Sequence, residues 1–345
     1  MTKDLFNRLA SAFQWPENAE IVSIGSGLIH KTWKIVFDHS AYILQQINHH
    51  VFQQPETIDH NISLLHSWLK ENDPTYLFIS PIPTINGNTL LETNDAFFRA
   101  YQFISGSHSI ERVNTADQAF EAARQFGLFT SKLSALPADN MKITIPRFHD
   151  LPFRYNQFID ACANGNPKRI QETKKTISEL IEKEYVVKQY EAFIQNPESK
   201  KRITHHDTKI SNVLFNDEEK GLCVIDLDTV MPGYFISDTG DMLRTYICPV
   251  SEEEHDISQI NIRKDFITAV HEGYMSEMGA KLSSFERNHF LFSGNYMIYM
   301  QALRFMTDYL QNDRYYGAKY PDHNLVRAGN QIHLLNEFIS ATKNK

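Results

Sequence analysis

Hydrophobic and polar positions alternate in short runs over the first hundred residues and recur at helical spacing over most of the rest of the chain. Residues 4–14 have the period of a short helix. Five strand-like runs follow, EIVSI, HKTWKIVF, AYILQQI, YLFIS and FFRAYQFI, and a proline-initiated helix over 55–70 interrupts them. Strands with one helix among them predict a small lobe that ends near Ile104.

Helical periodicity dominates beyond Gly106, and the segment 203–247 breaks it with short β-type pieces (VLFN, CVIDL) between polar loops. The expected helices cover residues 115–135, 152–163, 168–195 (long and charged), 261–277, 284–310 and 325–342. The predicted fold class is therefore α+β. A small β-rich lobe over 1–104 precedes a large, mainly helical lobe over 105–345, which suits a chain too long for one compact core.

Charge and composition exclude several classes of protein. Lys and Arg number 34 against 42 Asp and Glu, and a formal charge of -8 argues against a nucleic-acid partner. The three cysteines show no C-x-x-C pairing, so neither a zinc site nor a disulfide framework is expected. No run is long and apolar enough for a membrane span, and the N-terminus carries charge throughout, so we expect a cytoplasmic protein. The oligomeric state stays open.

The strongest local signal is a carboxylate, an amide five residues later and a second carboxylate after a β-hairpin. These groups are Asp207, Asn212 and Asp226, in HHDTKISN and then CVID. Phosphoryl transfer needs such a set: one Asp orients the attacking hydroxyl and accepts its proton, while an Asn and another Asp hold magnesium. The alternative for the first motif alone is a solvated loop, and the downstream hairpin favours the kinase reading.

This order resembles the catalytic loop and metal-binding Asp of the protein-kinase-like superfamily, in the form used by aminoglycoside and choline phosphotransferases. The resemblance implies a two-lobed kinase fold with residues 1–104 as the nucleotide-binding lobe and 105–345 as the catalytic and substrate-binding lobe. It assigns Asp207 and Lys209 to catalysis, Lys209 as the lysine that neutralises the transferred group. His205 is expected to brace the loop. ATP and Mg²⁺ are the implied cofactors.

The nucleotide end is expected at Gly25, Ser26 and Gly27, between two strand-like runs, where glycines let backbone amides approach phosphate oxygens. An ordinary hairpin turn is the alternative. The strand AYILQQI departs from the kinase pattern, because Gln45 and Gln46 stand where the phosphate-binding lysine is expected. Phosphate binding would then depend on magnesium, on the glycine loop and on Lys31 or Lys34, and the role of Glu56, the usual partner of that lysine, is in doubt.

The hinge between the lobes is expected at residues 101–104, where the backbone of Gln102 and Ile104 would meet the adenine edge. Tyr101 and Phe103 have the alternative of being core aromatics.

The substrate end combines carboxylates, an arginine and aromatic rings, a set that suits a polyhydroxylated ligand. Asp228 follows the metal motif, and Arg304 precedes a tyrosine pair, of which Tyr315 is the candidate. Asp238 and Asp241 have the alternative of bracing the catalytic loop, which we favour for Asp241.

The segments YILQQIN-HHVF, PETIDHNI and HHDTKISNVLF resemble the N-acetylhexosamine 1-kinase branch of the phosphotransferases over nearly the whole chain. The branch shares the glutamine in place of lysine. It implies transfer of the γ-phosphate to the anomeric hydroxyl of N-acetylglucosamine or N-acetylgalactosamine, with Asp228 and Arg304 holding sugar hydroxyls and Tyr315 nearby. The alternatives are a kinase for an aminoglycoside, choline or homoserine type of acceptor, and a nucleotide-binding scaffold without turnover.

Overall fold

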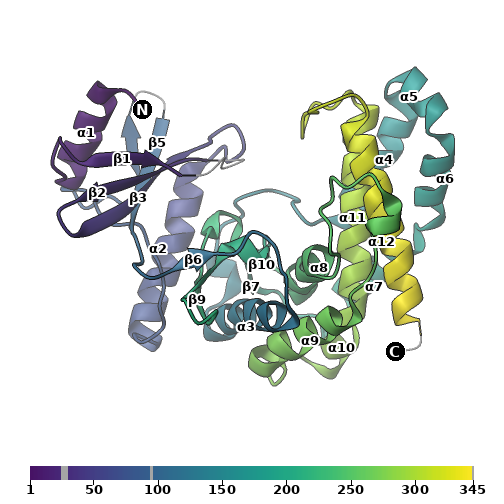
Figure 1. The fold of residues 1–345 in the computed structure, drawn as a ribbon. Coiled ribbons are helices and arrows are strands. Elements are labelled where there is room, and N and C mark those ends of the chain that lie inside the picture. Colours follow the sequence, from purple (N-terminus) through teal and green to yellow (C-terminus); the bar gives the residue numbers. More distant parts are fainter. Residues whose placement is uncertain (25–29, 94–95, 344–345) are drawn as a thin grey trace.

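A computed structural model describes residues 1–24, 30–93 and 96–343. Figure 1 shows two lobes: on one side a β-sheet that lies between α1 (Lys3–Phe13) and α2 (Pro55–Asn72), on the other a tower of helices, and short strands at the base between them. The protein-kinase-like α+β fold predicted from the sequence is confirmed. The predicted boundary at residue 104 falls between β5 (Ala96–Gln102) and β6 (His108–Ser109), and it stays a prediction as a division into domains.

The N-terminal lobe is a five-stranded antiparallel sheet in the order β1-β2-β3-β5-β4. Its elements are α1 (Lys3–Phe13), β1 (Glu20–Ser23), β2 (Lys31–Phe37), β3 (Ser40–Ile47), α2 (Pro55–Asn72), β4 (Leu91–Thr93) and β5 (Ala96–Gln102). Both predicted helices are confirmed. The strand predicted for YLFIS is wrong, since residues 77–80 are irregular. Pro81 and Pro83 follow at once, and proline cannot donate to a strand ladder.

The C-terminal lobe is mainly helical. Its helices are α3 (Ala116–Lys132), α4 (Leu151–Asn164), α5 (Pro167–Glu172), α6 (Lys174–Glu182), α7 (Tyr185–Gln195), α8 (Phe235–Tyr246), α9 (Lys264–Met278), α10 (Ser284–Asn288), α11 (Phe290–Leu310) and α12 (His323–Thr342). Short strands are β6 (His108–Ser109), β7 (Arg202–Thr204), β8 (Val213–Phe215), β9 (Gly221–Val224) and β10 (Met231–Gly233), and single turns of 3₁₀ helix include η2 (Ile210–Asn212) and η3 (Leu227–Thr229).

Three helix predictions need correction, the simplest being the helix expected over 284–310, which is divided at His289 into α10 and α11. The single helix expected over 168–195 is three helices, because the backbone leaves helical geometry at Thr173 and Lys183. Those breaks let apolar residues on both sides of the second break, Leu180 and Val186, become completely buried. Helix α8 was not predicted at all. Its middle, SDTGD, consists of residue types that favour turns and loops, and this masked apolar positions that recur at helical spacing on either side of it.

Two separate apolar clusters form the core. The smaller one joins α1 to one face of the sheet through Ile35, Leu44, Phe98 and Ala100. The larger one fills the C-terminal lobe, and it also includes the apolar face of α2. Helix α2 is further tied to the C-terminal lobe by Asn61, whose amide donates to the carbonyl of Val230 at 3.0 Å. The sheet therefore faces the C-terminal lobe from one side, with α2 beside it.

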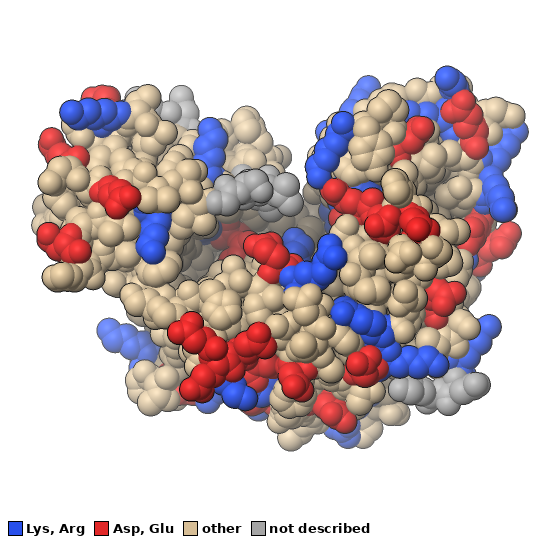
Figure 2. All heavy atoms as spheres, in the orientation of Figure 1, with Lys and Arg blue, Asp and Glu red and all other residues tan. Residues whose placement is uncertain are grey.

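A hollow separates the two lobes in the space-filling view, with acidic and basic side chains gathered near its floor (Figure 2). Among the described helices, none combines the length and the apolar character that a membrane crossing requires.

Candidate active site

The loop after β7 carries the predicted catalytic residues, and α8 holds its backbone in place. Asp238 accepts the backbone N–H groups of His205 and His206 at 3.0 and 2.8 Å. Asp241 accepts that of Thr208 at 2.9 Å. Burial raises the pKa of Asp238 to about 6, and the two N–H donors oppose that rise. Both aspartates thus brace the loop, as we favoured for Asp241, and the loop's shape is set before any ligand arrives.

His205 connects this loop to the turn that bears Asp226. Its ring is fully buried, packs edge-on against Phe126 at 5.1 Å, and hydrogen-bonds through Nε2 to the carbonyl of Ile225 at 2.9 Å. The expected bracing role of His205 is confirmed.

His206 has a left-handed backbone with φ of 65°, immediately before Asp207. Its buried ring lies so close to Gly233 that a Cβ there would come within 2.4 Å of His206 Nε2 and of Thr204 Oγ1. A side chain at position 233 would therefore push on the turn that aims Asp207. Strain held by surrounding packing is common where a catalytic group must be fixed in one direction.

Asp207 forms an ion pair with Lys209, whose Nζ lies 3.1 Å from the aspartate Oδ1. The Asp207 carboxylate raises the pKa of Lys209, so the lysine stays protonated. The structure therefore brings the two predicted catalytic residues together as an ion pair, and their roles in catalysis stay predictions.

The two predicted metal ligands lie beside Asp207. The side-chain amide of Asn212 donates an N–H to the backbone carbonyl of Asp207 at 2.8 Å, and the backbone carbonyl of Asn212 accepts the N–H of Ile225 at 2.9 Å. The first bond uses the nitrogen of the side-chain amide and leaves its oxygen for another partner. Asp226 follows directly, in a left-handed conformation with φ of 60°.

These groups fit a magnesium ion. Desolvation and the neighbouring carboxylates of Asp228 and Asp207 raise the pKa of Asp226 to about 6, and a cation beside it would favour its ionised form. The side chain of Asp226 is exposed, so an ion can reach it from the hollow between the lobes. The carboxylate of Asp226 and the amide oxygen of Asn212 are hard ligands of the kind that magnesium prefers.

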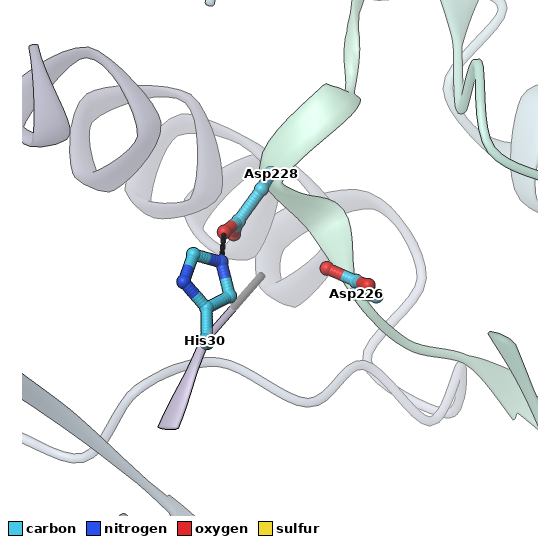
Figure 3. A group of neighbouring side chains, drawn as sticks. All are labelled: His30, Asp226 and Asp228. Atoms are coloured by element: carbon cyan, nitrogen blue, oxygen red, sulfur yellow. Dashed lines mark hydrogen bonds and ion pairs between the residues drawn. The ribbon is translucent and has the colours of Figure 1, made fainter. Parts of the chain in front are cut away.

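Asp228, predicted to bind substrate, has both carboxylate oxygens held by the N-terminal lobe. Arg99 of β5 donates from Nη1 at 2.5 Å and from Nη2 at 2.9 Å, and His30 lies 2.6 Å away through Nε2. Figure 3 shows His30 joined to Asp228, with Asp226 beside them on the same turn. Burial alone would raise the pKa of Asp228, but Arg99 and His30 hold it well below its usual range. Its contact with a substrate stays a prediction.

His30 is a hydrogen-bond donor here rather than a metal ligand. Its oxygen-facing Nε2 is one of three ligand atoms, with those of Asp226 and Asp228, that lie within 4.8 Å of one another. Its other nitrogen, Nδ1, accepts the backbone N–H of Asn48 at 3.0 Å. A neutral imidazole that accepts at Nδ1 carries its proton on Nε2, which therefore donates to Asp228.

The predicted nucleotide contacts are only partly within view. Gly25, Ser26 and Gly27 lie outside the described residues. Gln102 ends β5 opposite Tyr42, and the carbonyl of Ile104 accepts the N–H of Ser107 at 3.3 Å, so both stand on the connection between the lobes. Their contact with adenine stays a prediction.

The two residues predicted to bind the acceptor substrate, Arg304 and Tyr315, lie close together near the end of α11. Arg304 Nη2 lies 3.5 Å from the Tyr315 hydroxyl, and its guanidinium stands 5.4 Å from the centre of the Tyr316 ring and 5.5 Å from that of Phe148. The charge of Arg304 also contributes, after burial, to lowering the pKa of Arg154 to about 10. Within the described ranges, neither arginine has a carboxylate within ion-pair distance.

Sequence reasoning missed Arg99 and His30 as members of the site. Arg99 had a readable signal, since it stands inside the apolar strand run FFRAYQF, and a buried arginine requires a charged partner. The partner could not be named, because Asp228 is 129 residues away in the sequence.

The comparison with protein families matches residues 20–263 to the phosphotransferase enzyme family. That span covers the sheet, the catalytic loop, the turn that carries Asp226, and α8.

Solved structures with the same fold cover nearly the whole chain at low sequence identity. A microcompartment-associated aminopropanol kinase is 15% identical with a TM-score of 0.69, covering 99% of this chain and 98% of its own. Spectinomycin phosphotransferase APH(9)-Ia in complex with ADP and spectinomycin is 15% identical with a TM-score of 0.62, covering 100% and 99%. Choline kinase from Cryptosporidium parvum is 12% identical with a TM-score of 0.59, covering 99% and 97%. At such identities the likeness is one of fold.

Proposed function

The chain belongs to the phosphotransferase enzyme family, and on that premise we propose that it is an ATP- and magnesium-dependent kinase for the anomeric hydroxyl of N-acetylhexosamines, with the sugar 1-phosphate and ADP as products. The observation that carries the proposal is the convergence of Asp207, Asn212 and Asp226 on one braced loop and turn. The aminopropanol, spectinomycin and choline kinases share the fold and act on small molecules with hydroxyl groups.

Each residue has a distinct part in the transfer. Asp207 orients the acceptor hydroxyl and takes its proton as the oxygen attacks the γ-phosphorus and the bond to the leaving ADP oxygen breaks. Lys209, held 3.1 Å from Asp207, places positive charge beside the transferred group. Asn212 and Asp226 would hold magnesium, which neutralises charge on the phosphates. An anomeric hydroxyl is more acidic than an ordinary alcohol, so a carboxylate suffices as the base.

The acceptor side supports a neutral, polyhydroxylated substrate over a cationic one. Arg304 and Arg154 place two guanidinium groups near each other, and Tyr315, Tyr316 and Phe148 surround Arg304 with rings. Guanidinium donors suit hydroxyl oxygens, and rings stack on sugar faces. A quaternary amine or an aminoglycoside would meet like charge there, which disfavours binding.

A substrate panel tests the proposal. The protein is incubated with Mg-ATP and N-acetylglucosamine, N-acetylgalactosamine, glucose, choline, homoserine, aminopropanol or an aminoglycoside, and ADP release is followed. We expect turnover with the N-acetylhexosamines and a phosphorus NMR signal of a phosphate coupled to the anomeric proton. Turnover with an amine acceptor alone would reassign the substrate class. Absence of ADP release with every acceptor, despite MgATP binding, would favour the scaffold alternative.

A further inference from the structure

We propose that Arg99 of β5 is the cation that the N-terminal lobe presents to the nucleotide phosphates, in place of the lysine missing from β3. The inference rests on the proposed kinase function, since it concerns how the nucleotide is held. Its first support is the register of the sheet: Gln45 of β3 stands directly opposite Arg99. Residues paired in this way project from the same face of a sheet.

That face is the one turned toward the C-terminal lobe. The neighbours Leu44 on β3 and Phe98 and Ala100 on β5 point the other way, into the small core beneath α1. Side chains alternate along a strand, so Gln45 and Arg99 project from the opposite face. Gln46 pairs with Phe98 and therefore belongs to the α1 face. Gln45 is thus the residue at the position where a lysine was expected.

The same register decides between the other two cations. Lys31 pairs with Gln46 and so projects from the α1 face, away from the other lobe. Lys34 pairs with Ile43 on the correct face, but its Nζ lies over the Phe103 ring, 3.7 Å from its centre. Arg99, by contrast, reaches across to Asp228, on the turn that also carries Asp226.

Arg99 is fixed in direction yet retains donors for a ligand. Its Nε donates to the Gln45 side chain at 3.1 Å, and its two Nη atoms each donate once to Asp228. A guanidinium has five N–H groups, so with three engaged, one on each Nη remains for a phosphate oxygen, and because only 3% of the side chain is exposed such a contact would be shielded from water. Asp228 thereby takes the role of the carboxylate that orients the cation. Glu56 on α2, the residue expected for that role, is exposed.

The position of Arg99 beside the predicted metal ligands completes the geometry. An oxygen of Asp226 lies within 4.8 Å of the Asp228 carboxylate that Arg99 grips. A nucleotide whose phosphates share a magnesium ion with Asp226 would therefore bring them next to the guanidinium. Planar guanidinium groups suit phosphates well because they can donate two parallel hydrogen bonds.

Calorimetric titration with MgADP tests the proposal without any acceptor. We expect Arg99→Gln to bind MgADP about 10- to 100-fold more weakly than the wild type, the usual effect of losing charge-assisted bonds to a phosphate. Arg202→Gln is the matched control, because Arg202 is also buried and bidentately paired, with Glu286, outside the catalytic loop. It should lower the melting temperature and leave MgADP affinity unchanged.

A charge relocation sharpens the test. Gln45→Lys added to Arg99→Gln returns a cation to the same face one strand away, and it should recover at least part of the lost affinity. No recovery would assign the loss to the unpaired Asp228 and overturn the proposal. Unchanged affinity in Arg99→Gln would overturn it directly.

If Arg99→Gln does not fold, the double variant Arg99→Gln/Asp228→Asn removes both buried charges together and is titrated with MgADP in the same way. Weaker binding than the wild type would support the proposal, and unchanged affinity would overturn it. The outcomes also separate this proposal from the enzyme's function. A wild type that binds MgADP but phosphorylates no hexosamine would refute only the substrate assignment. A wild type that does not bind MgADP would refute both.

Discussion

The two walls of the hollow are built on different principles. On the C-terminal wall, the catalytic loop is held by buried carboxylates and hydrogen bonds from α8, about thirty residues away in the sequence. On the N-terminal wall, Arg99 of β5 and His30, the residue just before β2, are both held by Asp228 of the other lobe. In the proposed function, the catalytic residues thus all belong to one lobe, whereas the proposed contact with the nucleotide phosphates depends on an ion pair between the lobes.

The largest expected effect belongs to the C-terminal wall. Asp207→Asn keeps the size of the side chain but removes the proton acceptor, so kcat should fall by about 10²- to 10⁴-fold. MgADP affinity, measured by calorimetry, should change little because the metal ligands and the other wall are untouched. Wild-type turnover in this variant would remove Asp207 from the mechanism.

Two neighbouring carboxylates should respond in opposite ways. Asp228→Asn leaves the Arg99 charge buried without its partner, which typically costs about 3–5 kcal/mol of folding stability. Asp226→Asn relieves repulsion from Asp228 and Asp207, so stability should hold or rise while Mg²⁺-dependent ADP binding is lost. Chemical denaturation of both variants measures the contrast. Equal destabilisation of the two would mean that the walls are not coupled through Asp228.

Gly233→Ala probes how tightly the catalytic loop is packed. The added Cβ would fall 2.4 Å from His206 Nε2 and Thr204 Oγ1, and both neighbours are buried. Overpacking of this kind costs about 1–3 kcal/mol. We expect a lower melting temperature together with a lower kcat, because His206 precedes Asp207. Gly329→Ala, inside α12 with open space around the new Cβ, is the control: it should leave kcat unchanged and, because alanine favours a helix over glycine, raise the melting temperature slightly.

Lys34→Ala should give the smallest effect. Its ammonium lies over the Phe103 ring, and a part-exposed contact of this type contributes about 0.5–1 kcal/mol. We expect a slight loss of thermal stability and nearly unchanged MgADP affinity. A loss of affinity as large as that of Arg99→Gln would move the phosphate-facing cation to β2.

The sequence predicted the C-terminal wall far better than its partner. Asp207, Asn212 and Asp226 lie within twenty residues, and a single hairpin brings them together, so local pattern was sufficient. The gap on β3 was also readable as glutamine in place of lysine. Arg99, which we propose in place of that lysine, could not be identified from the sequence, because its position depends on the pairing of Gln45 with Arg99, which sequence periodicity does not specify. Helix α8 escaped for another reason: its polar residues are buried and satisfied, so they look like loop residues.

Helix α2 sits in the N-terminal half of the sequence but shares the apolar core of the C-terminal lobe, whereas the sheet has its own small core beneath α1 and meets the larger one through Ile47 and Phe97. A small core of this kind can open while the large one remains closed. Amide protons of β1, β2 and β3 are therefore expected to exchange with deuterated solvent sooner than those of α2. We therefore expect the segment before residue 55 to unfold first as one cooperative unit. Strand β5 would belong to the same unit, because it pairs with β3.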